Sequence, residues 1–184
     1  ISVGNGNASS FTTVNTSTYT ALITPIADGT VTLDINANVA QDSVGNFNTV
    51  ATQASTIYDA SRPSVAIQNV PATSNAPFTV TFVFSEAVTD FVVGDIIVGN
   101  GSASSFTTVN TSTYTALITP TNDGVVTLDI NANVAQDSVG NFNTVATQAS
   151  STYDASRPSV VIQNVPATSN APFTVTFVFS EAVT

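Results

Sequence analysis

The sequence contains no cysteine, no histidine and no lysine. Without cysteine the chain has no disulfide and no thiolate metal site, so its domains must be stabilised by other means. Without histidine and cysteine it lacks the usual general base and nucleophile of enzymes. A glycosidase would need two carboxylates opposed across a cleft, and a compact β domain offers no obvious cleft. We therefore expect a protein that is not an enzyme.

Positive charge is also scarce. Two arginines stand against twelve acidic residues, which gives a formal net charge of −10. Nucleic acids and anionic membrane surfaces are bound by clustered lysine and arginine, so both kinds of partner are disfavoured. No apolar run approaches the ~18 residues of a membrane-spanning helix, so we expect no membrane insertion. Because only 8% of the residues are charged, the surface must consist largely of neutral polar side chains.

The chain repeats itself at an offset of 95 residues. Residues 1–89 align with residues 96–184 without a gap, and the copies differ at only eight of the 89 positions. The linker Tyr58-Asp59-Ala60-Ser61-Arg62-Pro63 returns letter for letter at residues 153–158. A fixed period of this length predicts a tandem array of similar domains.

The hydrophobic pattern within each repeat is that of β-strands. Bulky apolar residues recur at every second position through residues 78–84 and 31–35, which is typical of strands with one buried face. Asn5-Gly6 and Asp28-Gly29 are residue pairs that accept the positive φ of tight turns. No segment has a sustained helical period. The sequence therefore predicts an all-β chain.

About seven short strands per repeat predict an immunoglobulin-type β-sandwich. The Arg-Pro linker precedes a fresh first strand and is the natural boundary. We expect a partial domain at 1–59 that lacks its first two strands, a complete domain at 60–154, and the first two strands of another domain at 155–184. An open sheet edge is a template for further strands, so the partial domains predict head-to-tail contacts with neighbouring repeats and possible self-assembly.

Several motifs, taken in their order along the chain, resemble a known family. They are the strand Phe-Thr-Val-Thr-Phe-Val-Phe-Ser-Glu-Ala-Val at 78–88, the Asp123-Gly124 turn, Asp-Ser-Val-Gly-Asn at 137–141, and the linker from Asp59 to Pro63. Together they are similar to the bacterial Ig-like repeats of giant secreted surface adhesins and biofilm-matrix proteins. The resemblance implies extender domains outside the bacterial cell or on its surface, with calcium at many domain junctions.

The acidic residues include candidates for such a calcium site. In an Ig-type topology, the start of a domain, the loop after its second strand and a late loop share one end, so Asp59, Glu86 and Asp137 should meet there. Carboxylates that converge without lysine repel one another unless a cation lies between them. Calcium accepts six to eight oxygen ligands in flexible geometry. Asn141 follows Asp137 by four residues in a loop that contains glycine, so both can face one point.

The remaining candidates extend this site or repeat it. Asp90 and Asp95 could join it, and Asp28 and Asp123 should face a junction from the opposite end of the preceding domain. The copies of the first set complete the candidate metal ligands: Asp42, Asn46, Asp154 and Glu181.

Simpler interpretations of these motifs stay open. Asp28-Gly29 and Asp123-Gly124 are also explained as hairpin turns, and residues 137–141 as a tight turn. Asp59 and Glu86 could form surface ion pairs with Arg62 instead of binding a metal. The Thr-x-Thr pattern at residues 16–20 invites an ice- or sugar-binding role, although the outward face of a strand explains it as well.

Three functions follow from these observations. The first is a structural extender repeat of a secreted adhesin or extracellular filament, stiffened by Ca²⁺ at the domain junctions. The second is a glycan- or cell-binding module, although near-identical copies favour repetition over diversified recognition. The third is a filament subunit whose partial end domains exchange strands between chains.

Overall fold

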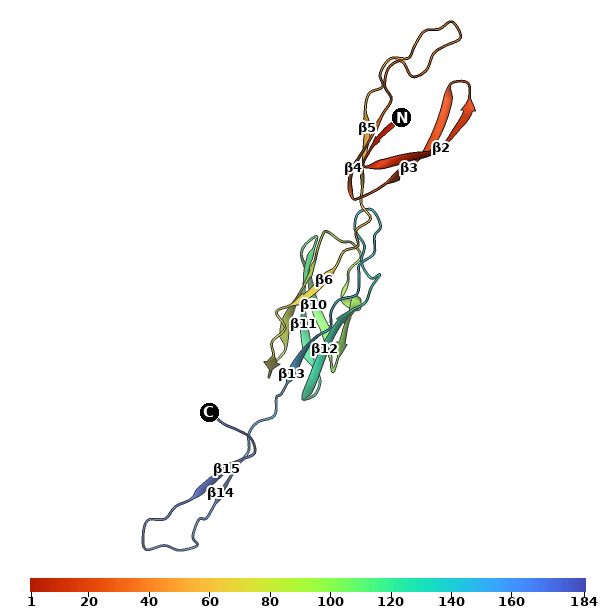
Figure 1. Cartoon of the computed structure of the whole chain (residues 1–184). Coiled ribbons are helices and arrows are strands. Elements are labelled where there is room, and N and C mark those ends of the chain that lie inside the picture. Colours follow the sequence, from red (N-terminus) through yellow and green to blue (C-terminus); the bar gives the residue numbers. More distant parts are fainter.

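The computed structural model describes all 184 residues and confirms the all-β prediction. The chain forms an elongated molecule in which residues 60–154 lie between an N-terminal and a C-terminal part (Figure 1). The one helical element is a three-residue 3₁₀ turn, η1 (Val93–Asp95). No helix is long and apolar enough to cross a membrane.

Equivalent strands occur in the three parts of the chain. Residues 1–59 contain β1 (Ser2–Gly4), β2 (Gly6–Asn15), β3 (Thr18–Pro25), β4 (Gly29–Asp34) and β5 (Ala54–Tyr58). Residues 60–154 contain β6 (Val65–Gln68), β7 (Thr73–Ser74), β8 (Phe78–Phe84), β9 (Ile96–Gly99), β10 (Gly101–Asn110), β11 (Thr113–Pro120), β12 (Gly124–Ile130) and β13 (Ala149–Tyr153). Residues 155–184 contain β14 (Val160–Gln163) and β15 (Thr176–Phe179).

Residues 60–154 form the predicted β-sandwich. One sheet has the strand order β10-β11-β8-β6 and the other has the order β7-β13-β12-β9. All neighbouring strands are antiparallel except β7 and β13, which are parallel. The sandwich has eight strands, one more than the sequence suggested, because the loop that carries Thr73 and Ser74 adds a short edge strand.

The core lies between these two sheets and contains fifteen buried apolar residues. Phe91 is its aromatic centre, with ring centroids of Phe82, Phe84, Phe106 and Tyr114 between 5.0 and 5.8 Å away. Phe91 precedes η1 rather than lying in a strand, so it has no period-two pattern to mark it as a core residue. Burying a side chain of this size contributes roughly 1.5–3 kcal/mol.

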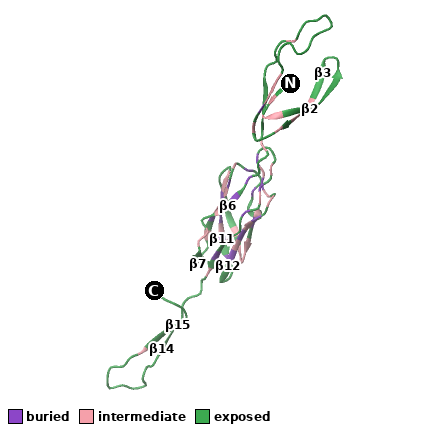
Figure 2. Ribbon diagram, viewed as in Figure 1, coloured by how far each residue is buried: buried purple, intermediate pink, exposed green.

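The same residue types are exposed in the two flanking parts (Figure 2). Tyr114 is 5% exposed, whereas its copy Tyr19 is 52% exposed. Phe82 is 0% exposed, whereas its copy Phe177 is 58% exposed. The difference arises because residues 1–59 contain no counterparts of β6 and β8, and residues 155–184 contain only the strand pair β14-β15, so neither part has both sheets of the sandwich complete.

Tyr114 provides a test of the core. Its hydroxyl donates to the carbonyl oxygens of Val88 (3.1 Å) and Thr111 (3.3 Å). We expect Tyr114→Phe to lower the free energy of unfolding by about 1–2 kcal/mol, because the buried carbonyl of Val88 loses its donor. Tyr19→Phe is the matched control, since Tyr19 is exposed, and it should leave the urea midpoint of the sandwich unchanged. Equal effects of both variants would contradict the hydrogen-bond assignment.

Candidate functional site

Three carboxylates meet where the linker enters the sandwich. Asp59 follows β5, Glu86 follows β8, and Asp137 lies in the loop between β12 and β13. One carboxylate oxygen from each of these residues lies within 4.8 Å of those of the other two. Asp137 is 5% exposed, and Asp59 and Glu86 are half-buried. The acidic group thus joins three segments that are distant in sequence.

A buried asparagine shapes the loop that carries Asp137. Asn143 is fully buried, and its Oδ1 accepts hydrogen bonds from the backbone of Val134 (2.8 Å) and Ala135 (2.9 Å). Its Nδ2 donates to the carbonyl oxygens of Asn131 (2.9 Å) and Thr144 (2.8 Å). The side chain therefore satisfies four backbone groups that strands cannot pair. Asn143 was not among the predicted site residues, although the sequence places it two residues after Asn141.

Hydrogen bonds between Asp137 and Asn141 hold both residues in place. One carboxylate oxygen of Asp137 accepts from the backbone N–H groups of Val139 (2.8 Å) and Asn141 (2.9 Å). The Asn141 amide donates to the other oxygen (2.8 Å) and to the carbonyl of Asp59 (3.1 Å). Burial of Asp137 opposes its ionisation, but these hydrogen bonds outweigh burial and hold its pKa below the usual value. Asp137 is therefore ionised at neutral pH.

Glu86 has the opposite shift. Burial raises the pKa of its carboxyl, and the negative charges of Asp59, Asp137 and Asp28 raise it further. The ionised form of Glu86 is therefore less favourable in the folded protein than in the unfolded chain. Burial is the larger cause of the raised pKa, and the smaller contribution from Asp59, Asp137 and Asp28 reflects the closeness of these negative charges.

The guanidinium of Arg62 does not use its hydrogen bonds on these carboxylates. Its Nε donates to the carbonyl oxygen of Phe142 (2.7 Å), and one terminal nitrogen donates to Asn133 Oδ1 (2.7 Å) and to the carbonyl of Asn143 (2.8 Å). Arg62 thus connects the linker to the loop that carries Asp137. The alternative ion pairs of Arg62 with Asp59 and Glu86 are not formed.

Asp28 reaches the same linker from the preceding repeat. Its carboxylate accepts from the backbone N–H of Ala60 (2.7 Å) and from the hydroxyl of Ser61 (2.5 Å). These hydrogen bonds, the one from Ser61 first, lower the pKa of Asp28. The next linker has the same clamp, in which Asp123 accepts from Ala155 (2.8 Å) and Ser156 (2.5 Å).

The hairpin interpretation of the Asp-Gly turns is wrong. Gly29 and Gly124 have positive φ values of 127° and 130°, as the sequence predicts. However, each turn connects strands of different sheets, β3 with β4 and β11 with β12. A connection between sheets lies at the end of the domain, and this position brings Asp28 and Asp123 to the linkers.

The other acidic candidates lie in different surroundings. Asp90 accepts from the side chain of Gln136 (2.9 Å), and Asp95 accepts from the backbone of Val92 (2.8 Å), so the structure does not bring either into the group of three. Asp42 bonds its own loop as Asp137 does, with Asn46 Nδ2 at 2.9 Å, but it is exposed. Asp154 accepts from the backbone of Ser156 (3.0 Å), and Glu181 is exposed. The copies of the group are thus divided between the two ends of the chain.

Residues 59–153 match the bacterial Ig-like domain family. The chain belongs to this family. Domains of this family are typically extracellular structural modules and are generally not enzymes. No curated protein and no solved structure matches the chain.

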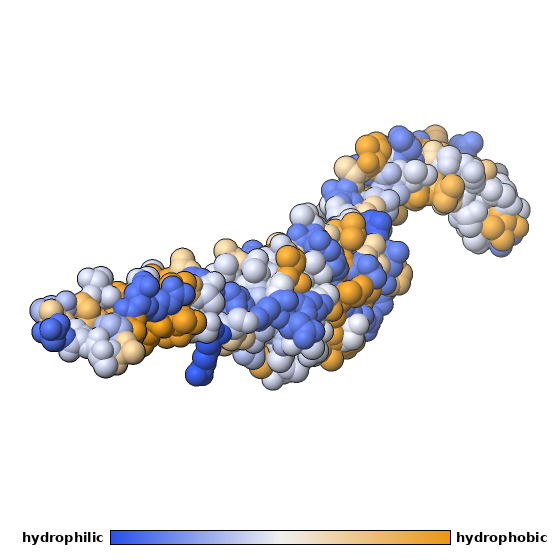
Figure 3. Space-filling model, turned by 90° about the horizontal axis from the view of Figure 1, so that it is seen from below, coloured by the Kyte–Doolittle hydropathy of each residue, from blue (hydrophilic) through white to orange (hydrophobic).

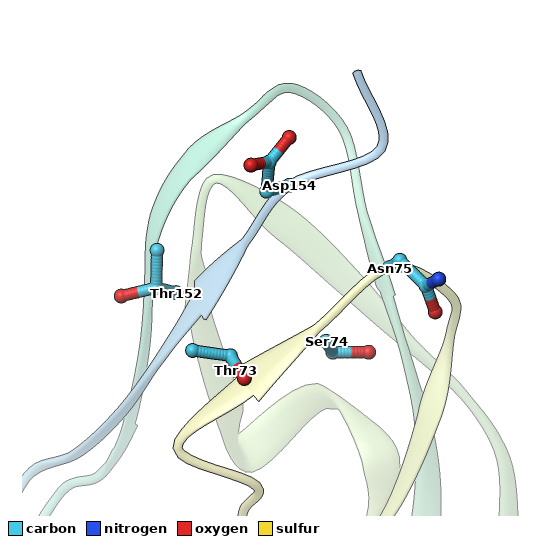
Figure 4. A pocket seen from close by; sticks show the side chains of 5 residues that line it. All are labelled: Thr73, Ser74, Asn75, Thr152 and Asp154. Carbon is cyan, nitrogen blue, oxygen red and sulfur yellow. The ribbon is translucent and has the colours of Figure 1, made fainter. Parts of the chain in front are cut away.

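A polar hollow lies at the other end of the Ig-like domain. It is lined by Thr73, Ser74, Asn75, Thr152 and Asp154 and has a volume of about 420 Å³. Figure 4 shows these side chains on and beside the parallel strands β7 and β13, without an apolar wall. Sites for small molecules are usually lined by hydrophobic and aromatic side chains. The hollow is therefore a polar surface depression beside the next linker, and its lining does not resemble that of a small-molecule site.

The close approach of Asp59, Glu86 and Asp137 predicts how the substitution Glu86→Gln changes the stability of the Ig-like domain. Since the folded-state pKa of Glu86 is raised, its ionisation reduces stability as the pH rises through the normal carboxyl range and above it. In metal-free buffer at pH 7 we expect Glu86→Gln to stabilise the Ig-like domain slightly, by less than about 1 kcal/mol. This gain should disappear near pH 3.

Glu181→Gln is the control for this experiment, because Glu181 has the same neighbours in sequence but lies outside the acidic group. Thermal unfolding of both variants in a chelator measures the effect. A Glu86→Gln variant that is less stable than the unchanged chain at pH 7 would contradict the repulsion.

The linker clamp predicts the behaviour of Asp28→Asn. A neutral asparagine at position 28 accepts the hydrogen bonds from the Ala60 N–H and the Ser61 hydroxyl less strongly than the aspartate does. The angle between the N-terminal part and the Ig-like domain should therefore vary more. Because the chain has no cysteine, spin labels can be attached at Thr13→Cys and Thr108→Cys, both exposed positions. We expect a broader distance distribution for Asp28→Asn.

Asp34→Asn controls for the loss of one charge, because Asp34 accepts from Gln53 and not from the linker. Distributions of equal width in the two variants would show that Asp28 does not restrain the linker.

Proposed function

We propose that this chain is a segment of an extender array in a secreted bacterial adhesin or extracellular filament, and that calcium binds at the junction between its repeats. The observation that carries the proposal is the meeting of Asp59, Glu86 and Asp137 at the linker. The family assignment supports an extracellular structural role. The near-identity of the repeats supports a role that depends on length.

The residues present fit a calcium ion. Calcium–oxygen distances are about 2.3–2.6 Å, so two oxygens on one ion lie at most ~5.2 Å apart. The carboxylate oxygens of the three residues lie within 4.8 Å of one another. Each residue offers one carboxylate oxygen at the common point, and the second oxygens of Asp59 and Glu86 could add to these toward the six to eight that calcium accepts, whereas Oδ1 of Asp137 already accepts two backbone hydrogen bonds. Their hard oxygen donors suit calcium better than softer transition metals.

The excess of negative charge at the junction also favours a bound cation. Asp28 adds a fourth carboxylate near Glu86, while the hydrogen bonds of Arg62 go to the neighbouring loop. A bound calcium ion would supply two positive charges at the point where these carboxylates repel one another. Asp59 belongs to the linker and Asp137 to the body of the domain, so holding both would restrict rotation of the linker.

The expected gain in stability is modest for each junction. Extracellular calcium modules bind with dissociation constants of about 10⁻⁴–10⁻³ M. At millimolar calcium and a dissociation constant near 0.1 mM, one site adds roughly 1.4 kcal/mol. In a domain of this size, 1 kcal/mol moves the thermal midpoint by about 4–8 °C. In an array, each junction would gain the same restraint.

Calcium-dependent unfolding tests the proposal. We expect millimolar calcium to raise the thermal midpoint of the dilute chain by several degrees relative to a chelator, and magnesium to raise it less. The double variant Asp137→Asn/Glu86→Gln should lose the calcium response. The control Asp42→Asn/Glu181→Gln changes the copies of these two residues, which lie outside the group, and should retain it. No response in the unchanged chain would overturn the calcium site and leave a junction held by Asp28, Arg62 and Asn141 alone.

A further inference from the structure

The linkers are the segments of this molecule that a protease would reach first. Figure 3 shows the narrow neck where the N-terminal part, at the right, joins the central domain, and Figure 1 shows the second linker as a bare segment between β13 and β14. Exposed segments between domains are the preferred sites of proteolytic cleavage. In an array that acts through its length, one cut in a linker would remove every domain beyond it.

All the basic side chains of the sequence lie in these two linkers. They are Arg62 and Arg157, because the sequence contains no lysine and no histidine. Serine proteases of the trypsin type have an acidic specificity pocket and cut after lysine or arginine. Arg62 and Arg157 are therefore the two positions at which such an enzyme recognises these 184 residues.

A proline follows each arginine directly, so cleavage would have to break the bonds Arg62–Pro63 and Arg157–Pro158. The proline ring fixes φ and takes the place of the backbone N–H. The residue after the cut then does not fit the extended backbone that the enzyme binds, and trypsin-type proteases scarcely cut before proline. This barrier belongs to the covalent structure, so it remains when the chain unfolds.

The fold adds a second barrier at Arg62. The three hydrogen bonds of its guanidinium run to the loop at residues 133–143. A trypsin-type enzyme must draw this side chain into its pocket, so these bonds must break first. Pro63 is fully buried, and its carbonyl oxygen accepts from the backbone N–H of Thr144 (2.8 Å).

Hydrogen bonds hold the linker on both sides of the Arg-Pro pair as well. Asp28 accepts from Ala60 and Ser61, and the backbone N–H of Ser64 donates to the Ser85 hydroxyl (3.0 Å). A protease binds its substrate as an extended segment of several residues. It can extend this linker in its cleft only after the linker has opened locally.

We propose that the linkers of this chain resist proteases of the trypsin type, through the proline after each arginine and, at Arg62, through the contacts that hold Arg62 and Pro63 in the folded domain. Arg62 can thus join the linker to the domain without creating a cleavage site. The resistance goes beyond the extender role and does not depend on calcium.

Digestion of the unfolded chain tests the proline barrier. The full chain is treated with trypsin in a chelator and in urea at a concentration that unfolds the chain and leaves the enzyme active, with casein digested in parallel as the control for activity. We expect the unchanged chain to stay intact, and Pro63→Ala and Pro158→Ala each to be cut once, after Arg62 or Arg157. Cleavage of the unchanged chain as fast as that of the variants would overturn the proposal.

Digestion of the folded chain tests the structural barrier. Residues 58–65 and 153–160 have the same sequence, but Pro63 is buried and Pro158 is exposed. Cleavage follows the population of the open linker, and several hydrogen bonds must break to open it at Pro63, so folded Pro63→Ala should be cut on the order of 100-fold more slowly than folded Pro158→Ala. Equal rates in the two folded variants would show that the fold adds no barrier.

A second pair of variants leaves both prolines in place. Ala60→Lys and Ala155→Lys each introduce one bond that trypsin cuts, at exposed and equivalent positions of the two linkers. The folded Ala60→Lys chain should again be cut far more slowly than the folded Ala155→Lys chain. Comparable rates would contradict the structural barrier, and this comparison holds even where Pro63→Ala does not fold.

The contribution of the Arg62 guanidinium is measured in the Pro63→Ala background. Arg62→Lys keeps a side chain that trypsin recognises, but an ammonium group lacks the planar fork with which the guanidinium reaches its three acceptors. The double variant should therefore be cut faster than Pro63→Ala in the folded state. An unchanged rate would show that the guanidinium does not protect the linker.

Discussion

The pairing of β8 with β6 and β11 is the interaction on which the rest of the structure depends. It brings Val80, Phe82 and Phe84 into the space between the sheets, where they are fully or almost fully buried. Residues 155–184 keep the pairing of β14 with β15 but have no counterpart of β11, residues 1–59 have no counterparts of β6 and β8, and both parts keep large apolar side chains exposed. Since the chain has no disulfide, burial of apolar surface is the main source of stability for the sandwich. The N-terminal strand pair of each repeat therefore decides whether the repeat closes.

The junction between repeats combines polar restraint with unbalanced charge. Asp28 holds the linker from the preceding repeat, and Arg62 and Asn141 hold it from the following domain. These hydrogen bonds leave Asp59 and Glu86 close to Asp137, so the segment where the domains meet is also the most acidic point that the fold creates. The raised pKa of Glu86 reflects this arrangement. The linker is therefore restrained by charge-assisted hydrogen bonds of Asp28 and Arg62, and it lies beside a group of three carboxylates.

Sequence reasoning was most effective where a pattern is local. The period-two pattern at 78–84 predicted β8, and Gly29 has the positive φ that the Asp-Gly pair indicated. It failed where a role depends on distant partners. Phe91 precedes a 3₁₀ turn and has no periodic neighbours, and Asn143 looks like an ordinary loop residue. The Asp28-Gly29 pair is equally compatible with a hairpin, because nothing local distinguishes a hairpin from a connection between two sheets.

The sequence by itself determined the repeat, the all-β class and the strand positions, because these follow from composition and from periodicity over a few residues. It also allowed Asp59, Glu86 and Asp137 to be assigned to one end of the domain through an assumed topology. Only the tertiary structure decided which of the seven acids of a repeat lie within reach of one another, and that Arg62 bonds a loop. Burial and electrostatics depend on contacts between segments more than twenty residues apart, which no local pattern encodes.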